Sequence, residues 1–345
     1  MSPAVPKTKL IALALQGGGS HGAFTWGVLD RLLEDERIRI AGISGTSAGA
    51  INAAVLAHGY ETNGRDGARK KLSDFWKGIS QKGAFSPYYS GILNPLGADW
   101  SPLATGFDLF TQFFSPYQTN PFNINPLRNI LAETIDFDRL QRCGKIRLFI
   151  SATNVNTNHL HIFTNEQISL DVLLASSCLP HVNQAVPISG DYFWDGGFMG
   201  NPALEPLVCQ CEVADIVIVQ INPTIRRDLP RHAVDIADRI NEITFNSNLM
   251  REVSFYVNIT QMIEKGLIND PRIERIYFHI IPITQELAHL GVRSKMDTSW
   301  TLISSLFAAG RKQAEKWLAN HFDDLGLRTT LNLAEWMPTR ELKPD

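Results

Sequence analysis

No stretch of this sequence reaches the roughly 18 consecutive apolar residues that a membrane-spanning helix requires. The net charge is only −3, so the surplus of lysine and arginine typical of nucleic-acid-binding proteins is missing. The four cysteines show no CxxC pair, and cytosolic free thiols are the simplest account of them. Residues 1–9 lack the features of a signal peptide. These absences predict a cytoplasmic protein with free thiols and no nucleic-acid partner.

A serine between two glycines stands where a strand-like segment meets a helix-like one. Residues 45–49 read Gly-Thr-Ser-Ala-Gly, after the apolar run 38–43 and before the helix-like run 50–58. This is the pattern of a nucleophile elbow, in which a sharp turn exposes the serine hydroxyl and small neighbours let strand and helix approach. The pattern predicts Ser47 as a nucleophile that attacks acyl groups. A Gly/Ser-rich loop without chemistry is the alternative.

Two further segments have features that acyl transfer requires. Residues 17–22, Gly-Gly-Gly-Ser-His-Gly, follow a strand-like run and open a helix-like one. Backbone N–H groups at a helix N-terminus favour negative charge, so this loop is a candidate oxyanion hole. Residues 195–197, Asp-Gly-Gly, follow an aromatic run. An aspartate at a strand end, followed by glycines, can project its carboxylate into a cleft.

In this order, the three motifs resemble the patatin-like phospholipase family. Three additional stretches agree with it, at 151–154 (Ser-Ala-Thr-Asn), 175–180 (Ala-Ser-Ser-Cys-Leu-Pro) and 201–202 (Asn-Pro). The resemblance covers about residues 8–222. It implies a serine acyl-ester hydrolase, of the phospholipase A or lysophospholipase type, that works with a Ser-Asp dyad.

The resemblance also implies a role for each motif residue. Ser47 is the nucleophile, Asp195 its general base, and the amides of Gly17, Gly18 and Gly19 line the oxyanion hole. The chain departs from the family at His21, where the family usually has lysine or arginine. A fixed positive charge at that position is therefore in doubt.

Two other interpretations compete with the dyad. A Ser-Asp-His triad would need a histidine after Asp195, and four are available: His232, His279, His289 and His321. A nucleotide-binding module would use the pattern Gly17-x-Gly19-x-x-Gly22, which matches the dinucleotide fingerprint. That fingerprint wants an acidic residue at the end of the second strand, where this chain has the serine elbow instead.

Helix-like and strand-like segments alternate along the chain, which predicts an α/β sheet with helices on both faces. The helix-like segments are 23–33, 50–58, 64–79, 126–135, 168–176, 234–265 and 298–319; the strand-like segments are 10–15, 38–43, 146–152, 159–163, 215–221 and 275–281. The family resemblance implies a single three-layer α/β/α domain with a central, mostly parallel sheet.

The expected domain organisation has four parts. A catalytic core spans 8–222, and an aromatic-rich insert interrupts it at about 83–123. Residues 223–337 form a helical and strand extension on the same domain, and 338–345 a tail. The insert interleaves phenylalanine, tyrosine and tryptophan with proline and glycine and has almost no charge. It is interpreted either as a lid or acyl-binding wall, or as an irregular segment packed on the core.

No metal or cofactor is expected, because a serine and an aspartate suffice for ester hydrolysis. His159 and His161 lie two residues apart on a strand-like segment, but the sequence suggests no third metal ligand nearby. The expected partner is a lipid or acyl-ester substrate. Phospholipid, lysophospholipid, neutral glyceride and polyester oligomer all stay open, as do a transient contact with a membrane surface and the oligomeric state.

Overall fold

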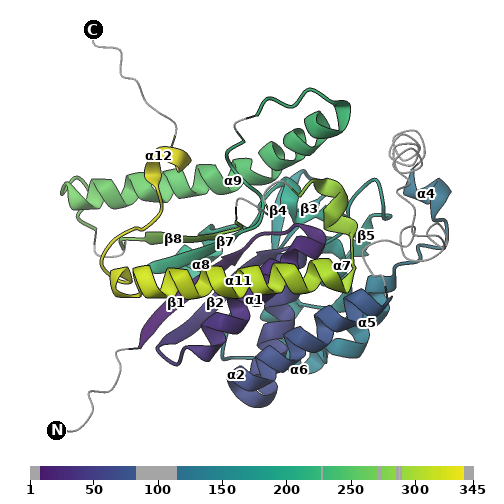
Figure 1. Ribbon diagram of the computed structural model, residues 1–345, viewed down its shortest axis with the longest axis horizontal. Coiled ribbons are helices and arrows are strands. Elements are labelled where there is room, and N and C mark those ends of the chain that lie inside the picture. Colours follow the sequence, from purple (N-terminus) through teal and green to yellow (C-terminus); the bar gives the residue numbers. More distant parts are fainter. Residues whose placement is uncertain are drawn as a thin grey trace.

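A central eight-stranded sheet carries the fold (Figure 1). The computed structural model describes residues 8–82, 115–226, 228–270, 274–284, 287 and 290–337. The strands are β1 (Lys9–Leu15), β2 (Ile38–Thr46), β3 (Arg147–Asn154), β4 (His159–Thr164), β5 (Val186–Ile188), β6 (Asp191–Asp195), β7 (Asp215–Gln220) and β8 (Tyr277–Pro282). Their order is β5-β6-β3-β2-β1-β7-β8, with β4 paired to β3.

The sheet is mostly parallel at its centre. Strand β1 pairs in parallel with β2 and β7, and the parallel ladder continues to β3 on one side and β8 on the other. Strands β4, β5 and β6 join through antiparallel pairs at the β3 side. Since β1 is buried on both faces, its sequence is a continuous apolar run, as parallel sheets require.

Alternate residues of β1 point to two separate apolar layers. Ile11, Leu13 and Leu15 pack in one cluster with residues of α1 (Gly22–Glu34), α2 (Ala48–Lys82) and α11 (Trp300–His321). Ala12 and Ala14 pack in the other with α8 (Glu205–Gln210), α9 (Ala233–Glu264) and α12 (Leu333–Trp336). Figure 1 shows α9 crossing the sheet on the side opposite α1 and α2. The predicted three-layer α/β/α architecture is confirmed.

The remaining helices are short, and several begin at side-chain caps. They are α4 (Pro116–Thr119), α5 (Pro126–Thr134), α6 (Phe137–Gln141), α7 (Leu170–Ser176) and the 3₁₀ turns η1 (Gly19–His21), η2 (Asn165–Gln167), η3 (Gly196–Phe198), η4 (Val292–Met296) and η5 (Phe322–Asp324). Asn125, Ser169 and Ser299 accept backbone N–H bonds at the starts of α5, α7 and α11. Helix α2 is interrupted by non-helical backbone at Asn63 and Gly64, where the sequence predicts one helix to end and another to begin.

The C-terminal part adds a strand to the sheet and helices to both of its faces. Strand β8 pairs with β7, and α11 lies directly on α1. The two helices approach closely because a side chain at Gly27 would collide with the Phe307 carbonyl, and one at Gly310 with the Phe24 carbonyl. These contacts support our proposal that residues 223–337 extend the same domain. Residues 83–114 of the insert and the tail 338–345 lie outside the described residues.

None of the described helices is long and apolar enough to cross a membrane.

Candidate active site

Ser47 lies on a strained turn between β2 and α2. Its φ of 54° is in the left-handed region that non-glycine residues rarely adopt. A side chain at Gly49 would collide with the carbonyl of Leu15, and a Cβ at Gly45 would lie 2.7 Å from the carbonyl carbon of Gly49. The predicted close approach of strand and helix is therefore confirmed, and both flanking glycines are sterically required. The Ser47 side chain is largely buried, with 8% of the residue exposed.

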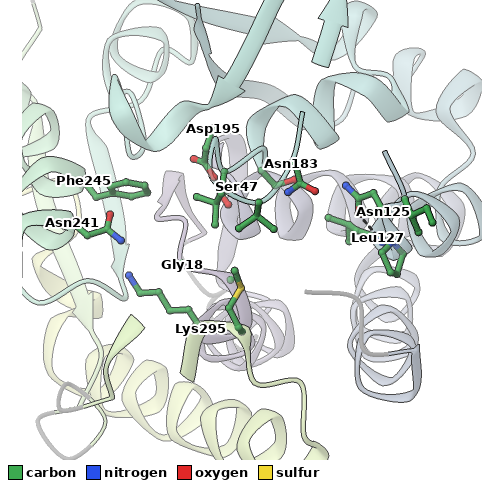
Figure 2. Close-up of a pocket in the computed structure, with 16 residues that line it drawn as sticks. Gly18, Ser47, Asn125, Leu127, Asn183, Asp195, Asn241, Phe245 and Lys295 are labelled. Carbon is green, nitrogen blue, oxygen red and sulfur yellow. Dashed lines mark hydrogen bonds between the residues drawn. The ribbon is translucent and has the colours of Figure 1, made fainter. Parts of the chain in front are cut away.

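Strand register brings Asp195 next to Ser47. Strand β2 pairs with β3 up to Thr46, which lies opposite Ser151. Strand β4 occupies the other edge of β3. From Ala152, the residue after Ser151, the edge of β3 that paired with β2 pairs instead with β6, and Asp195 lies opposite Ala152. The last residue of β6 thus lies just beyond the last residue of β2. Figure 2 shows the Ser47 and Asp195 side chains side by side.

Asp195 is a buried carboxylate with few compensating donors. Only 1% of it is exposed. Its Oδ1 accepts the Gly197 N–H at 2.7 Å, and the Ser47 side chain lies beside the carboxylate. Burial raises the pKa of Asp195 to about 7, although the Gly197 N–H, the Ser47 hydroxyl and the charge of Lys295 act to lower it. A carboxylate with such a pKa can accept a serine proton near neutral pH.

The glycine-rich loop divides into two parts. The Gly17 N–H donates to Asn201 Oδ1 at 2.6 Å, so this amide is already engaged. Gly18 and Gly19 line the pocket beside Ser47, and Gly19 opens the turn η1 that leads into α1. All three oxyanion donors stay predictions, and the engaged amide of Gly17 is the least available of them.

Two polar side chains hold the elbow and the loop in place. Ser176 Oγ accepts the backbone N–H of Ser47 at 2.9 Å. Asn222 Nδ2 donates to the Gly17 carbonyl at 2.8 Å. Ser176 and Asn201 fall within stretches that the sequence analysis singled out without a role. Asn222 was missed, although it follows β7, and the carboxyl ends of strands form the ligand-binding edge of an α/β sheet.

The pocket extends to both sides of Ser47 and Asp195 (Figure 2). One side is lined by apolar residues from the end of the insert, the start of α5 and the segment after α7: Ile124, Pro126, Leu127, Leu179 and Val182. The other side carries Asn241 and Phe245 of α9 and Lys295 of η4. Lys295 has no motif around it in the sequence, so only the fold reveals it.

The candidate triad histidines that the structure describes lie away from this pocket. His279 is buried on β8, where Nε2 contacts Asp215 Oδ1 and Nδ1 contacts Thr330 Oγ1, both at 2.9 Å. His321 contacts Asp324, and His232 is exposed at the start of α9. None of these three lines the pocket. His289 lies outside the described residues.

A serine on a strained strand-to-helix turn, with a buried carboxylate and a glycine-rich loop beside it, is typical of α/β-class ester hydrolases. The chain belongs to the patatin-like phospholipase family, whose model matches residues 13–208.

Two solved structures that match the chain share little sequence with it. VipD from Legionella pneumophila is 15% identical with a TM-score of 0.39, over 92% of this chain and 68% of that one. A chain from the SpcU–ExoU complex of the type III secretion system of Pseudomonas aeruginosa is 16% identical with a TM-score of 0.30. That match covers 90% of this chain and 53%, about half, of the other. No curated protein matches the sequence.

Replacing Gly19 by alanine tests the oxyanion loop. Gly19 has a φ of 56°, and a methyl group there would collide with the Lys295 carbonyl. Alanine keeps the backbone N–H, but the collision would move it out of line with the oxyanion. We expect a folded protein whose kcat is lower by about 10²–10³-fold, comparable to the loss of one oxyanion donor. The kcat on a short-chain ester, with circular dichroism as a check of folding, measures this.

Gly64→Ala is the matched control for this variant. Gly64 has a similar φ of 58° in the interruption of α2, but an added Cβ there meets no atom within 4 Å. Gly64→Ala therefore places an alanine at a similar positive φ without touching the pocket, and we expect wild-type kcat. Wild-type kcat in Gly19→Ala as well would place the oxyanion donors elsewhere.

Proposed function

We propose that the protein is a serine-dependent lipid acyl hydrolase that uses Ser47 and Asp195 as a catalytic dyad. Membership of the patatin-like phospholipase family supports hydrolysis of lipid acyl esters. The observation that carries the finer proposal is the position of the Ser47 side chain beside the buried Asp195 carboxylate, inside a pocket with an apolar side. That side offers a place for an acyl chain next to the nucleophile.

The proposed reaction has two half-reactions. Ser47 Oγ attacks the ester carbonyl carbon while Asp195 takes the hydroxyl proton, and the amides of Gly18 and Gly19 donate to the oxyanion. Asp195 then gives this proton to the leaving alcohol, and the acyl group stays on Ser47. Water attacks the acyl-enzyme, with Asp195 again as the base, and the fatty acid leaves as Ser47 regains its proton.

A fluorophosphonate probe and a panel of acyl esters test this function. The probe phosphonylates an activated serine, and mass spectrometry locates it. We expect label on Ser47 and hydrolysis of acyl esters in the panel. A protein that neither reacts with the probe nor cleaves any ester would refute the proposed function.

The pKa of Asp195 predicts the acid limb of the pH profile. The base must be deprotonated to accept the serine proton, and its pKa is raised to about 7 by burial. We therefore expect kcat/KM to fall about tenfold for each pH unit below 7 and to level off above it. Initial rates on a neutral ester between pH 5 and 9 measure this. A profile that stays flat down to pH 5 would contradict the role of Asp195.

A further inference from the structure

Lys295 is the only lysine or arginine among the described residues that line the pocket. It comes from the C-terminal part of the chain, in the turn η4, and its side chain is half-buried. Its Nζ donates to Asn222 Oδ1 at 2.8 Å. In Figure 2 the ammonium group lies beside Asn241 and across the pocket from Leu127, with Ser47 between the two sides.

The position of this lysine is fixed relative to the oxyanion loop. The Lys295 backbone packs so closely on Gly19 that no side chain fits there. The neighbouring Ser294 Oγ lies 2.7 Å from Nε2 of His21, the residue that follows this loop. A cation anchored to the loop in this way keeps a constant place with respect to the scissile ester.

His21, in the glycine-rich loop, brings no charge to this site. His21 is buried, and its pKa is lowered to about 3 by burial and by the charge of Lys295. The imidazole is therefore neutral at physiological pH. Lys295 brings a positive charge to the pocket from a different element.

Three carboxylates act on Lys295: Glu242, Asp238 and Asp195. Glu242 already pairs with Arg226 at 2.6 Å and with Arg239 at 3.1 Å. Burial lowers the pKa of Lys295 below its ordinary value, as does the charge of Arg226, while the charges of Glu242, Asp238 and Asp195 act to raise it. A substrate anion beside the ammonium would favour the charged form in the same way.

We propose that Lys295, with Asn241 beside it, forms a subsite for the phosphate group of the substrate. This proposal rests on the proposed hydrolase function and deepens it. A substrate would lie across Ser47 with its acyl chain toward Leu127 and its phosphate toward Lys295. The enzyme would then prefer acyl esters with a phosphate headgroup to neutral glycerides of the same acyl chain.

The kinetic test uses two substrates that differ only in the phosphate: oleoyl lysophosphatidate and monooleoylglycerol. We expect Lys295→Met to lower the ratio of their kcat/KM values by about 10- to 100-fold, the range for a lost hydrogen bond to a charged group. The loss should fall mainly on KM, since the phosphate charge does not change during the reaction. Any effect that acts through Asp195 is common to both substrates and cancels in the ratio.

Two other variants complete this test. Lys295→Arg keeps the charge and should retain most of the preference for the phosphate substrate. Lys316→Met removes an exposed lysine of α11 and should leave the ratio at its wild-type value. If Lys295→Met lowers kcat equally for both substrates, the lysine acts on the reaction itself, and the subsite is wrong.

A binding experiment tests the subsite without hydrolysis. Isothermal titration of dodecyl phosphate should give a Kd about tenfold or more higher for Lys295→Met than for the wild type. Equal affinities would overturn the subsite even if the enzyme hydrolyses esters. If inorganic phosphate binds as tightly as dodecyl phosphate, the site accepts free phosphate, and the assignment to a lipid headgroup is wrong. A protein that binds dodecyl phosphate through Lys295 but cleaves neither ester would refute only the hydrolase function.

Discussion

Ser47→Ala will abolish labelling by the fluorophosphonate probe and lower kcat by about 10³-fold or more. The variant removes the only atom that forms the acyl-enzyme bond in the proposed reaction. The oxyanion donors and the pocket stay in place, so a small residual rate over water is expected. Labelling is read by mass spectrometry, and kcat by hydrolysis of the best ester found in the panel.

Folding and reagent specificity need separate controls for this result. The methyl group of alanine fits wherever the serine Cβ fits, so circular dichroism and the melting temperature should change little. Ser254→Ala removes a hydroxyl of α9 that bonds to the Trp336 carbonyl, and it should retain full labelling at Ser47. Label on any serine other than Ser47 in the wild type would contradict the assignment of the nucleophile.

The elements with strong periodicity could be predicted from sequence, and those fixed by tertiary contacts could not. The long helices α9 and α11 and the buried strand β1 match their predicted ranges to within one or two residues. Strand β5 has only three residues, Val186–Ile188, and no periodic pattern to detect. It exists because it pairs with β6, and such pairing depends on register that a single sequence does not encode locally.

The same distinction applies to the site. Ser47 and Asp195 lie in short motifs whose backbone geometry restricts the sequence, so both could be proposed from the sequence. Their contact depends on β6 continuing the edge that β2 leaves, which no motif reveals. The sequence could not show that the Gly17 amide is engaged while those of Gly18 and Gly19 line the pocket, because the Gly17 partner, Asn201, is distant in the chain.

Asp195→Asn will lower kcat by about 10⁴-fold, comparable to disabling a member of a catalytic triad. Asparagine has nearly the same shape and can still accept the Gly197 N–H, but an amide cannot take the serine proton. His232→Gln and His321→Gln, at two surface histidines of the rival triad, should lose at most a few-fold. A folded histidine variant with a 10⁴-fold loss, or an active Asp195→Asn, would overturn the dyad.

Stability measurements show whether Asp195→Asn acts through chemistry or through folding. Burial raises the pKa of Asp195 from 3.8 to about 7, so between these values the folded protein binds a proton that the unfolded chain does not. This group therefore lowers stability progressively as pH rises from about 4 to about 7. Asparagine is uncharged at every pH, so the variant does not lose stability in this pH range.

We expect the inactive variant to be more stable than the wild type at pH 8, on the order of a few kcal/mol, and similar to it below pH 4. Urea unfolding of both proteins at the two pH values measures the difference. If the variant is less stable than the wild type at pH 8, its lost activity reflects lost structure. If it is more stable and inactive, the negative charge of Asp195 destabilises the folded protein but is needed for the reaction.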